Sequence, residues 1–228
     1  MRINFTILIS FFLLFSKSIS AQTVEQIMPN ISHALAEQHW NEASNLFHIA
    51  VDKDLYKSEK FFLDSISFNC PARAEMLYQL GFYCKHTRNY EKAYVYYKEL
   101  LQLKPNEVSY LVPCAELEVV LGKEDEALKT YEKILALDNN NLAANIYIGN
   151  YYFFTADKEK RTLDKEFKKV ETPTRMQYAN YRNELARLVK TEYEKAKAHL
   201  EKVISQFPSS EAKKTLDKIH LVELESNK

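Results

Sequence analysis

The chain has 228 residues with equal numbers of basic and acidic side chains, 31 Lys and Arg against 31 Asp and Glu, so its formal net charge is zero. A balanced charge provides no strong basic field of the kind typical of nucleic-acid-binding proteins, and we expect no nucleic-acid partner. The chain contains only 3 Gly and 6 Pro, while aromatic residues make up 13% of it. This composition favours an all-α protein over a glycine-punctuated β fold or a disordered chain.

The first 21 residues have the pattern of a secretory signal peptide. Arg2 precedes a mostly apolar run over residues 5–15, and the small residues of 18–21 follow it. We expect cleavage after Ala21. The apolar run is shorter than the roughly 20 residues that span a bilayer, and no Cys follows it directly. The sequence therefore predicts an exported protein, periplasmic or secreted, that is not lipid-anchored and has no integral membrane segment after cleavage.

Residues 74–107 have the pattern of two antiparallel helices joined by a polar turn. Ala93 follows Gly81 by twelve positions, Tyr97 follows Ala93 by four, and Pro105 follows Ala93 by twelve. The two small residues allow the helices to approach closely, and Tyr97 fills the space beside them. Pro105 ends the second helix because proline cannot continue it.

This pattern resembles the tetratricopeptide repeat (TPR) family, in which a Leu-Gly pair and an aromatic residue in one helix are followed by Ala, an aromatic residue and Pro. Leu77 and Cys84 stand where the family has Trp and Tyr. The resemblance implies an all-α, right-handed solenoid of antiparallel helix pairs that ends in a C-terminal capping helix.

The same spacing divides the rest of the mature chain into segments. The predicted segments are the signal peptide, 1–21; a degenerate TPR-like helix pair, 22–57; an apolar spacer that forms a short helix, 58–73; two TPRs, 74–107 and 108–141; a TPR with a degenerate second helix, 142–175; a TPR with a degenerate first helix, 176–210; and the capping helix and tail, 211–228.

The region after the third repeat allows two interpretations. Tyr152 belongs to a good first-helix signature, but Arg161 and Lys165 stand where Ala and an aromatic residue are expected. Either two half-degenerate repeats follow each other, or one repeat carries an insertion of 35 residues between Tyr152 and Tyr193. Pro173 keeps the repeat period, and we therefore favour two repeats.

No pattern in the sequence indicates catalysis. The scarcity of Gly argues against a phosphate-binding loop or a dinucleotide fingerprint, and the six His have no metal-ligand spacing. We expect no enzyme activity, no cofactor and no metal. Cys70, Cys84 and Cys114 are odd in number and form no disulfide framework, and pairing of Cys84 with Cys114 is left open. A basic run over residues 158–169 is interleaved with acidic residues, and we interpret it as a solvated helix face.

The family resemblance also implies where a partner binds. In a TPR solenoid the first helices of the repeats line a concave groove, and aromatic and aliphatic side chains there suit an extended peptide or an amphipathic helix. The groove residues that the resemblance implies are Tyr78, Phe82, Lys85, His86, Val112, Glu116, Val119, Ile146, Asn150, Phe153, Phe154, Tyr178 and Tyr181.

The function that the sequence predicts is an exported adaptor that binds a peptide or helix of a protein partner in this groove. The alternative is a self-assembling structural component of an envelope complex. In that case the aromatic surface is buried against another copy of the chain, as a homo-oligomer.

Overall fold

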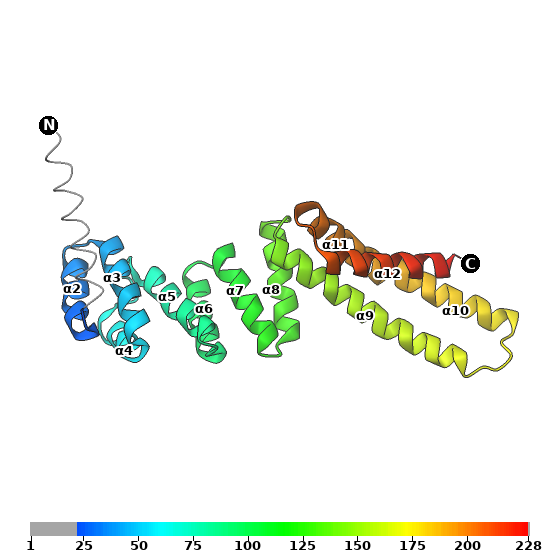
Figure 1. Ribbon diagram of the computed structural model, residues 1–228, viewed down its shortest axis with the longest axis horizontal. Helices are drawn as coiled ribbons and strands as arrows, with labels where there is room; N and C mark the ends of the chain where they lie inside the picture. The colour runs from blue at the N-terminus through cyan, green and yellow to red at the C-terminus, as the bar shows by residue number, and fades with distance from the viewer. Residues whose placement is uncertain (1–21, 228) are drawn as a thin grey trace, which may run out of the picture. The chain divides into compact units, whose positions relative to one another are not determined.

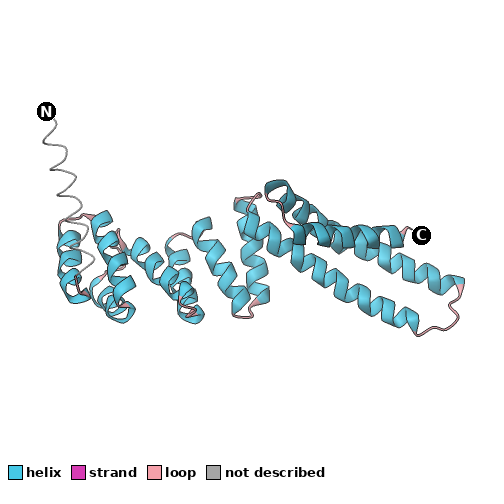
Figure 2. Ribbon diagram, viewed as in Figure 1, coloured by secondary structure: helices cyan, strands magenta, loops and turns pink. Residues whose placement is uncertain are grey.

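The computed structural model describes residues 22–227, and over this range the chain folds into helices without any strand (Figure 1, Figure 2). The prediction of an all-α fold is confirmed. The expected signal peptide lies outside the described residues. None of the described helices combines the length and the apolar character that crossing a membrane requires. The chain divides into two compact units, Met1–Pro105 and Asn106–Lys228, which we describe one at a time.

The first unit contains two helix pairs and one extra helix. Helix α2 (Val24–Ala36) packs against α3 (Trp40–Lys53), and α5 (Arg73–His86) packs against α6 (Tyr90–Leu103). The short helix α4 (Leu55–Ser65) contacts α2, α3 and α5. It occupies the segment for which the sequence predicts a spacer helix, but it begins three residues before residue 58.

The second unit begins with a further helix pair, α7 (Val108–Val120) and α8 (Glu124–Leu137). It continues with the long helix α9 (Leu142–Lys168), α10 (Arg175–Leu188), a π-helical turn (Val189–Tyr193), α11 (Glu194–Gln206) and α12 (Ser210–Ser226). Helix α9 packs mainly against α11, and α11 also packs against α12. The C-terminal helix begins where the Ser209 hydroxyl accepts a hydrogen bond from the backbone N–H of Ala212 at 3.1 Å.

Three of the helix pairs have the same turn. A residue with positive φ follows the first helix in each, and the next residue donates its backbone N–H to the carbonyl five positions earlier, at 2.8 Å. This arrangement satisfies a carbonyl at the helix end and reverses the chain. The residues with positive φ are Gln38, Arg88 and Gly122.

The long helix α9 has no such turn. Ala156 lies 34 residues after Gly122, one repeat period along the chain, yet the helix continues through it to Lys168. The segment 155–161 contains Ala, Lys, Glu and Arg, which favour helix, and no Gly, Asn or Pro that would end one. The repeat's first helix therefore extends beyond its usual end.

The close approach of the Gly149 backbone in α9 to the Leu200 side chain in α11 shows which helix pairs with α9. A Cβ added at Gly81 of α5 would lie 3.2 Å from Cε2 of Tyr97 in α6. A Cβ added at Gly149 of α9 would lie 2.9 Å from Cγ of Leu200 in α11. Because each glycine lets the partner helix come close, α11 is the counterpart of α6.

The pairing of α9 with α11 corrects the expected division of residues 142–210. A helix pair is expected within 142–175, but a single helix spans most of that segment. The alternative, a repeat with a 35-residue insertion, matches the arrangement: the second half of α9 and α10 lie between the two halves of one repeat. An insertion of 35 residues is one residue longer than the repeat period, so Pro208 after α11 stays close to register, and the spacing of terminators cannot distinguish the two interpretations.

Polar contacts at the N-terminal end of α9 also join it to α11. The amide Nδ2 of Asn145 donates to the backbone carbonyls of Asn139, at 3.1 Å, and Asn141, at 2.8 Å. Its Oδ1 therefore accepts, and Nδ1 of His199 in α11 donates to it at 2.8 Å. Burial, together with the nearby Lys202, lowers the pKa of His199, so its ring stays neutral at pH 7.

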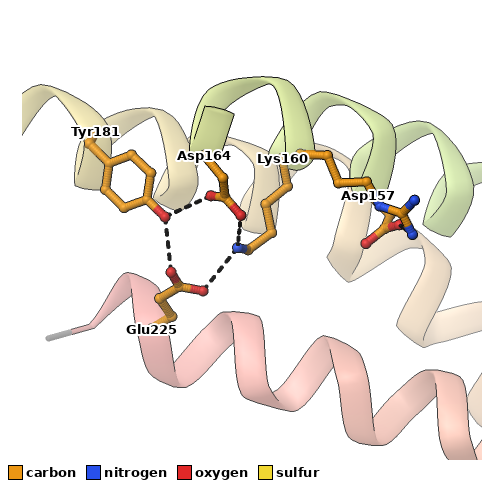
Figure 3. A network of polar contacts seen from close by, with 6 residues as sticks. Asp157, Lys160, Asp164, Tyr181 and Glu225 are labelled. Carbon is orange, nitrogen blue, oxygen red and sulfur yellow. Dashed lines mark hydrogen bonds and ion pairs between the residues drawn. The ribbon is translucent and has the colours of Figure 1, made fainter. Parts of the chain in front are cut away.

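A polar network holds the inserted helices to the C-terminal helix (Figure 3). Nζ of Lys160 in α9 lies 2.8 Å from Asp164 and 3.1 Å from Glu225 of α12. The phenol of Tyr181 in α10 lies 2.8 Å from the first carboxylate and 2.9 Å from the second. Burial works against the charge of Lys160, but its hydrogen bonds to both carboxylates outweigh burial and raise its pKa. The network therefore joins three helices around one ammonium group.

We expect Tyr97→Ala to destabilise the protein by about 3–5 kcal/mol, because the ring fills the space between α5 and α6 and is only 1% exposed. Urea unfolding followed by circular dichroism measures the loss. Val95→Ala, on the exposed side of the same helix, is the control and should change stability by less than about 0.5 kcal/mol. A loss below about 1 kcal/mol for Tyr97→Ala would contradict the packing described.

We expect Gly149→Ala to cost about 1–3 kcal/mol, because the new methyl group meets Leu200 at less than van der Waals distance. In a Leu200→Ala background the same substitution should cost less or stabilise, since the space is open and Ala favours helix by about 1 kcal/mol. A double-mutant cycle measures this coupling. Effects that add to within about 0.3 kcal/mol would show that α9 and α11 are not paired as described.

Candidate functional site

In the first unit, three side chains of α5 form an aromatic row. Tyr78, Phe82 and His86 are spaced by four residues and share one face of the helix. Their ring centroids lie 6.0 Å apart for the first pair and 3.9 Å apart for the second. Nδ1 of His86 donates to the carbonyl of Phe82 at 2.9 Å, which fixes the imidazole over the phenyl ring. Phe82 is 39% exposed, so the row offers a partner an apolar surface.

The other side of this row is anchored in the core. Tyr78 is half-buried and packs edge-on against Tyr97, with centroids 6.2 Å apart. Lys85 lies beside the row and is also half-buried. The packing of Tyr78 limits the motion of the neighbouring aromatic rings, and a partner would meet a largely preformed surface.

In the second unit, the three predicted residues of α7 differ in accessibility. Val112 and Glu116 are half-buried, and Val119 is 39% exposed. These exposures neither confirm nor contradict the groove prediction for this helix, which stays a prediction.

The first half of α9 carries three of the predicted positions at the surface. Phe154 is 63% exposed and Ile146 is 40% exposed, while Asn150 is half-buried between them. An open pocket of about 440 Å³ lies along this face. Its lining residues are Glu124, Tyr147, Asn150, Tyr151, Phe154, Thr155 and Lys158.

Two tyrosines of this pocket are absent from the sequence prediction. Tyr147 stacks on Tyr131 of α8 with centroids 4.4 Å apart, and Tyr151 follows at 6.4 Å from Tyr147. Burial raises the pKa of Tyr131 and of Tyr147, so both phenols stay protonated at neutral pH. The four-residue spacing of Tyr147 and Tyr151 was a signal that could have identified them.

Phe153 is a correction to the predicted groove. It is 4% exposed and lies in the core formed by α9, α11 and α12, with its ring 6.1 Å from that of Tyr193. Adjacent residues on a helix point about 100° apart, and the pairing with α11 turns Phe153 inward while Phe154 stays in solvent.

Tyr178 and Tyr181 lie on the inserted helix α10 and not on the first helix of a repeat. Their rings pack against Phe167 of α9, with centroids at 5.1 Å and 4.5 Å. Tyr178 is half exposed, whereas the hydroxyl of Tyr181 is engaged by the network of Figure 3. Both stabilise the insertion, and neither contributes to the pocket beside Phe154.

A second open pocket continues from the first along α9. It has a volume of about 500 Å³ and is lined by Phe154, Asp157, Lys158, Arg161, Thr162 and Lys165. Phe154 and Lys158 belong to both pockets. The basic residues, which the sequence suggests are a solvated helix face, thus extend an aromatic pocket.

The described residues include no group of three or more His, Cys, Asp or Glu side chains placed to hold a metal ion. Cys70, Cys84 and Cys114 are free thiols. Burial raises the pKa of Cys84 to about 11, so its thiol is protonated and unreactive at neutral pH.

Comparison with known proteins identifies one repeat in the chain and a solved structure of similar fold. The model of the tetratricopeptide repeat matches residues 74–107. A solved structure from Bacteroides ovatus ATCC 8483, provisionally described as a protein-binding protein, is 43% identical, with a TM-score of 0.79 over 90% of this chain and 100% of that one. A tetratricopeptide repeat protein from Parabacteroides merdae ATCC 43184 is 17% identical, with a TM-score of 0.40 over 89% of this chain and 74% of that one.

A curated relative matches a smaller part. Anaphase-promoting complex subunit 7 of Arabidopsis thaliana is 34% identical over 88 residues, which are 39% of this chain and only 15% of that protein. The family model identifies a tetratricopeptide repeat at residues 74–107, and the same turn recurs in two other helix pairs. The Bacteroides ovatus structure shares the fold over 90% of this chain.

Proposed function

We propose that the protein is an adaptor that binds a peptide or a helix of a protein partner on the exposed aromatic faces of its first helices. The observation that carries the proposal is Phe154, a large aromatic side chain left 63% exposed beside stacked tyrosines in an open pocket. Aromatic side chains contribute much of the binding energy at protein interfaces, and a clustered apolar surface of this kind indicates an interaction site.

The first unit supports the same function independently. Its aromatic row, Tyr78, Phe82 and His86, is held by Tyr97 and by a backbone hydrogen bond. Extended repeat proteins commonly bind partners on the surface that their first helices form. Each unit therefore has an accessible aromatic surface of its own to which a partner can bind.

We further propose that the adaptor acts outside the cytoplasm, as a periplasmic or secreted protein without a lipid anchor. The apolar run at residues 5–15 and the small residues before Ala21 support this proposal.

We expect a Phe82→Ala, Phe154→Ala variant of the mature chain to lose partner binding, because it removes an apolar anchor from each unit. Affinity capture from the envelope fraction of the protein's own cells identifies the partner, and titration of the purified partner measures the loss, which should be at least about tenfold. Thermal stability should change little, since both side chains are substantially exposed.

The matched control is Tyr56→Ala with Phe207→Ala, which removes two exposed aromatic side chains away from the first helices of the repeats. The control should bind as the unmodified protein does. Normal binding by the Phe82→Ala, Phe154→Ala variant would show that the surface is assigned wrongly. If light scattering instead finds an oligomer that this variant disrupts, the partner is a second copy and the self-assembling component is the better description.

We expect the mature protein from its own cells to begin at Gln22. Intact-mass measurement of the protein from the cell envelope or the medium tests this, and an Ala21→Leu variant should be processed slowly because the cleavage site requires small residues. Recovery of the full 228-residue chain from the cytoplasm would contradict export.

A further inference from the structure

One face of α9 changes from aromatic to basic along its length. Six positions separated alternately by four and three residues lie on the same side of a helix. The first three are aromatic and the last three are basic. We call these residues the α9 stripe: Tyr147, Tyr151, Phe154, Lys158, Arg161 and Lys165.

The helix separates charges that are mixed in the sequence. Most acidic residues of the segment 158–169 turn to other faces, where they form ion pairs. Glu159 pairs with Arg187 of α10 at 2.6 Å, Asp164 pairs with Lys160 at 2.8 Å, and Glu166 pairs with Lys169 at 2.6 Å. These three carboxylates are therefore engaged away from the stripe, whereas Asp157, just before the segment, pairs with Arg161 of the stripe.

The cations of the stripe are accessible. Within residues 22–227, neither Lys158 nor Lys165 has a carboxylate in ion-pair range. Arg161 pairs with Asp157 at 2.7 Å but keeps 79% of its side chain exposed. The stripe thus carries positive charge that nothing in the described second unit neutralises fully.

The two halves of the stripe form one continuous surface. The pocket that holds Tyr147 and Tyr151 shares Phe154 and Lys158 with the pocket that holds Arg161 and Lys165. A single ligand can therefore contact the aromatic and the basic half together.

We propose that the α9 stripe binds an acidic segment of a protein partner, with an apolar side chain of that segment on Tyr151 and Phe154 and its carboxylates on Lys158, Arg161 and Lys165. This inference rests on the proposed adaptor function and names the chemistry of its partner. Opposite charge gives specificity and fast association, and the aromatic half supplies the anchor that exposed ion pairs alone do not.

The residues around the stripe determine the direction in which the ligand binds. Glu124 lines the pocket at the aromatic end, whereas three cations and one carboxylate, Asp157, line the pocket at the other end, so the aromatic end is the less favourable place for a carboxylate of the ligand. The acidic part of the ligand must then lie over the inserted half of α9, beyond the repeat itself. The specificity of the adaptor is therefore located in the insertion.

The length of the stripe sets the length of the ligand. From Tyr147 to Lys165 the helix rises about 27 Å at about 1.5 Å per residue. An extended peptide of about eight residues spans this distance at about 3.3 Å per residue. The basic half is about 10 Å long, so two or three acidic residues in a row match it.

The test uses the mature chain and fluorescent peptides of about eight residues, the length that spans the stripe. Each peptide has two Phe and three Asp separated by three Gly, and a pair of peptides presents the two halves in opposite order. Matched neutral peptides carry Asn in place of Asp. A single-stranded RNA of about ten nucleotides is the third probe, because stacking aromatics and cations also suit nucleic acid.

The decisive variant is Lys158→Ala, Arg161→Ala, Lys165→Ala. Its control is Lys129→Ala, Lys213→Ala, Lys214→Ala, which removes the same charge from exposed positions on α8 and α12. Circular dichroism melting shows that both variants fold.

We expect the unmodified chain to bind one acidic peptide at least about tenfold more tightly than its neutral match, with affinity that falls as salt rises. The decisive variant should lose this preference and the control should keep it. Equal binding of acidic and neutral peptides, no binding of either, or an unchanged preference in the decisive variant would overturn the proposal. If the RNA binds more tightly than the acidic peptides, the ligand of the stripe is a nucleic acid and the proposal fails. If the chain forms a dimer that the decisive variant dissociates, the stripe binds a second copy of the chain and the proposal also fails.

The partner captured with the unmodified chain separates this inference from the adaptor function. If Phe82→Ala, Phe154→Ala abolishes binding of that partner while the decisive variant binds it normally, the adaptor function holds and the acidic-segment inference fails. If neither variant affects binding, the adaptor surface itself is assigned wrongly.

Discussion

The close approach of α9 and α11 at Gly149 determines the architecture of the second unit. A Cβ at Gly149 would lie 2.9 Å from Cγ of Leu200, closer than side chains normally approach, and a Cβ at Gly81 in the first unit would lie in tight contact, 3.2 Å, with the ring of Tyr97. The second helix of the last repeat is thereby identified as α11, although it begins 26 residues after α9 ends. The second half of α9, α10 and the π-helical turn must then serve to bring the chain back to α11.

The continuity of α9 links this fold to function. Because α9 is one continuous helix of 27 residues, the spacing of the charged residues along the sequence determines which face of the helix each one lies on. Lys160 and Asp164 face α10 and α12 and stabilise the insertion (Figure 3), while Lys158 and Lys165 stay with Phe154 on the open side. A turn near Ala156 would place the aromatic half and the basic half of the stripe on different helices.

Sequence spacing predicts the repeats where the packing residues follow the family pattern. It fails after the third repeat, because two tandem repeats and one repeat with a 35-residue insertion give nearly the same spacing. Gly81, Ala93 and Tyr97 correctly indicate the α5 and α6 pair. Pro173 is misleading because an insertion of 35 residues shifts the register by only about one residue from a full repeat. The candidate site shows the same limit: Phe153 and Phe154 are neighbours, and only the position of α11 decides which of them is buried.

Native-state amide hydrogen exchange across α9 tests the central claim, that one unbroken helix joins the repeat to its insertion. We predict that the amides of residues 155–160 exchange as slowly as those of 144–153, because both segments are hydrogen-bonded within one packed helix. Exchange at 155–160 as fast as in the connecting segment 170–174 would show a turn at this position. That result would contradict both the insertion and the continuous stripe.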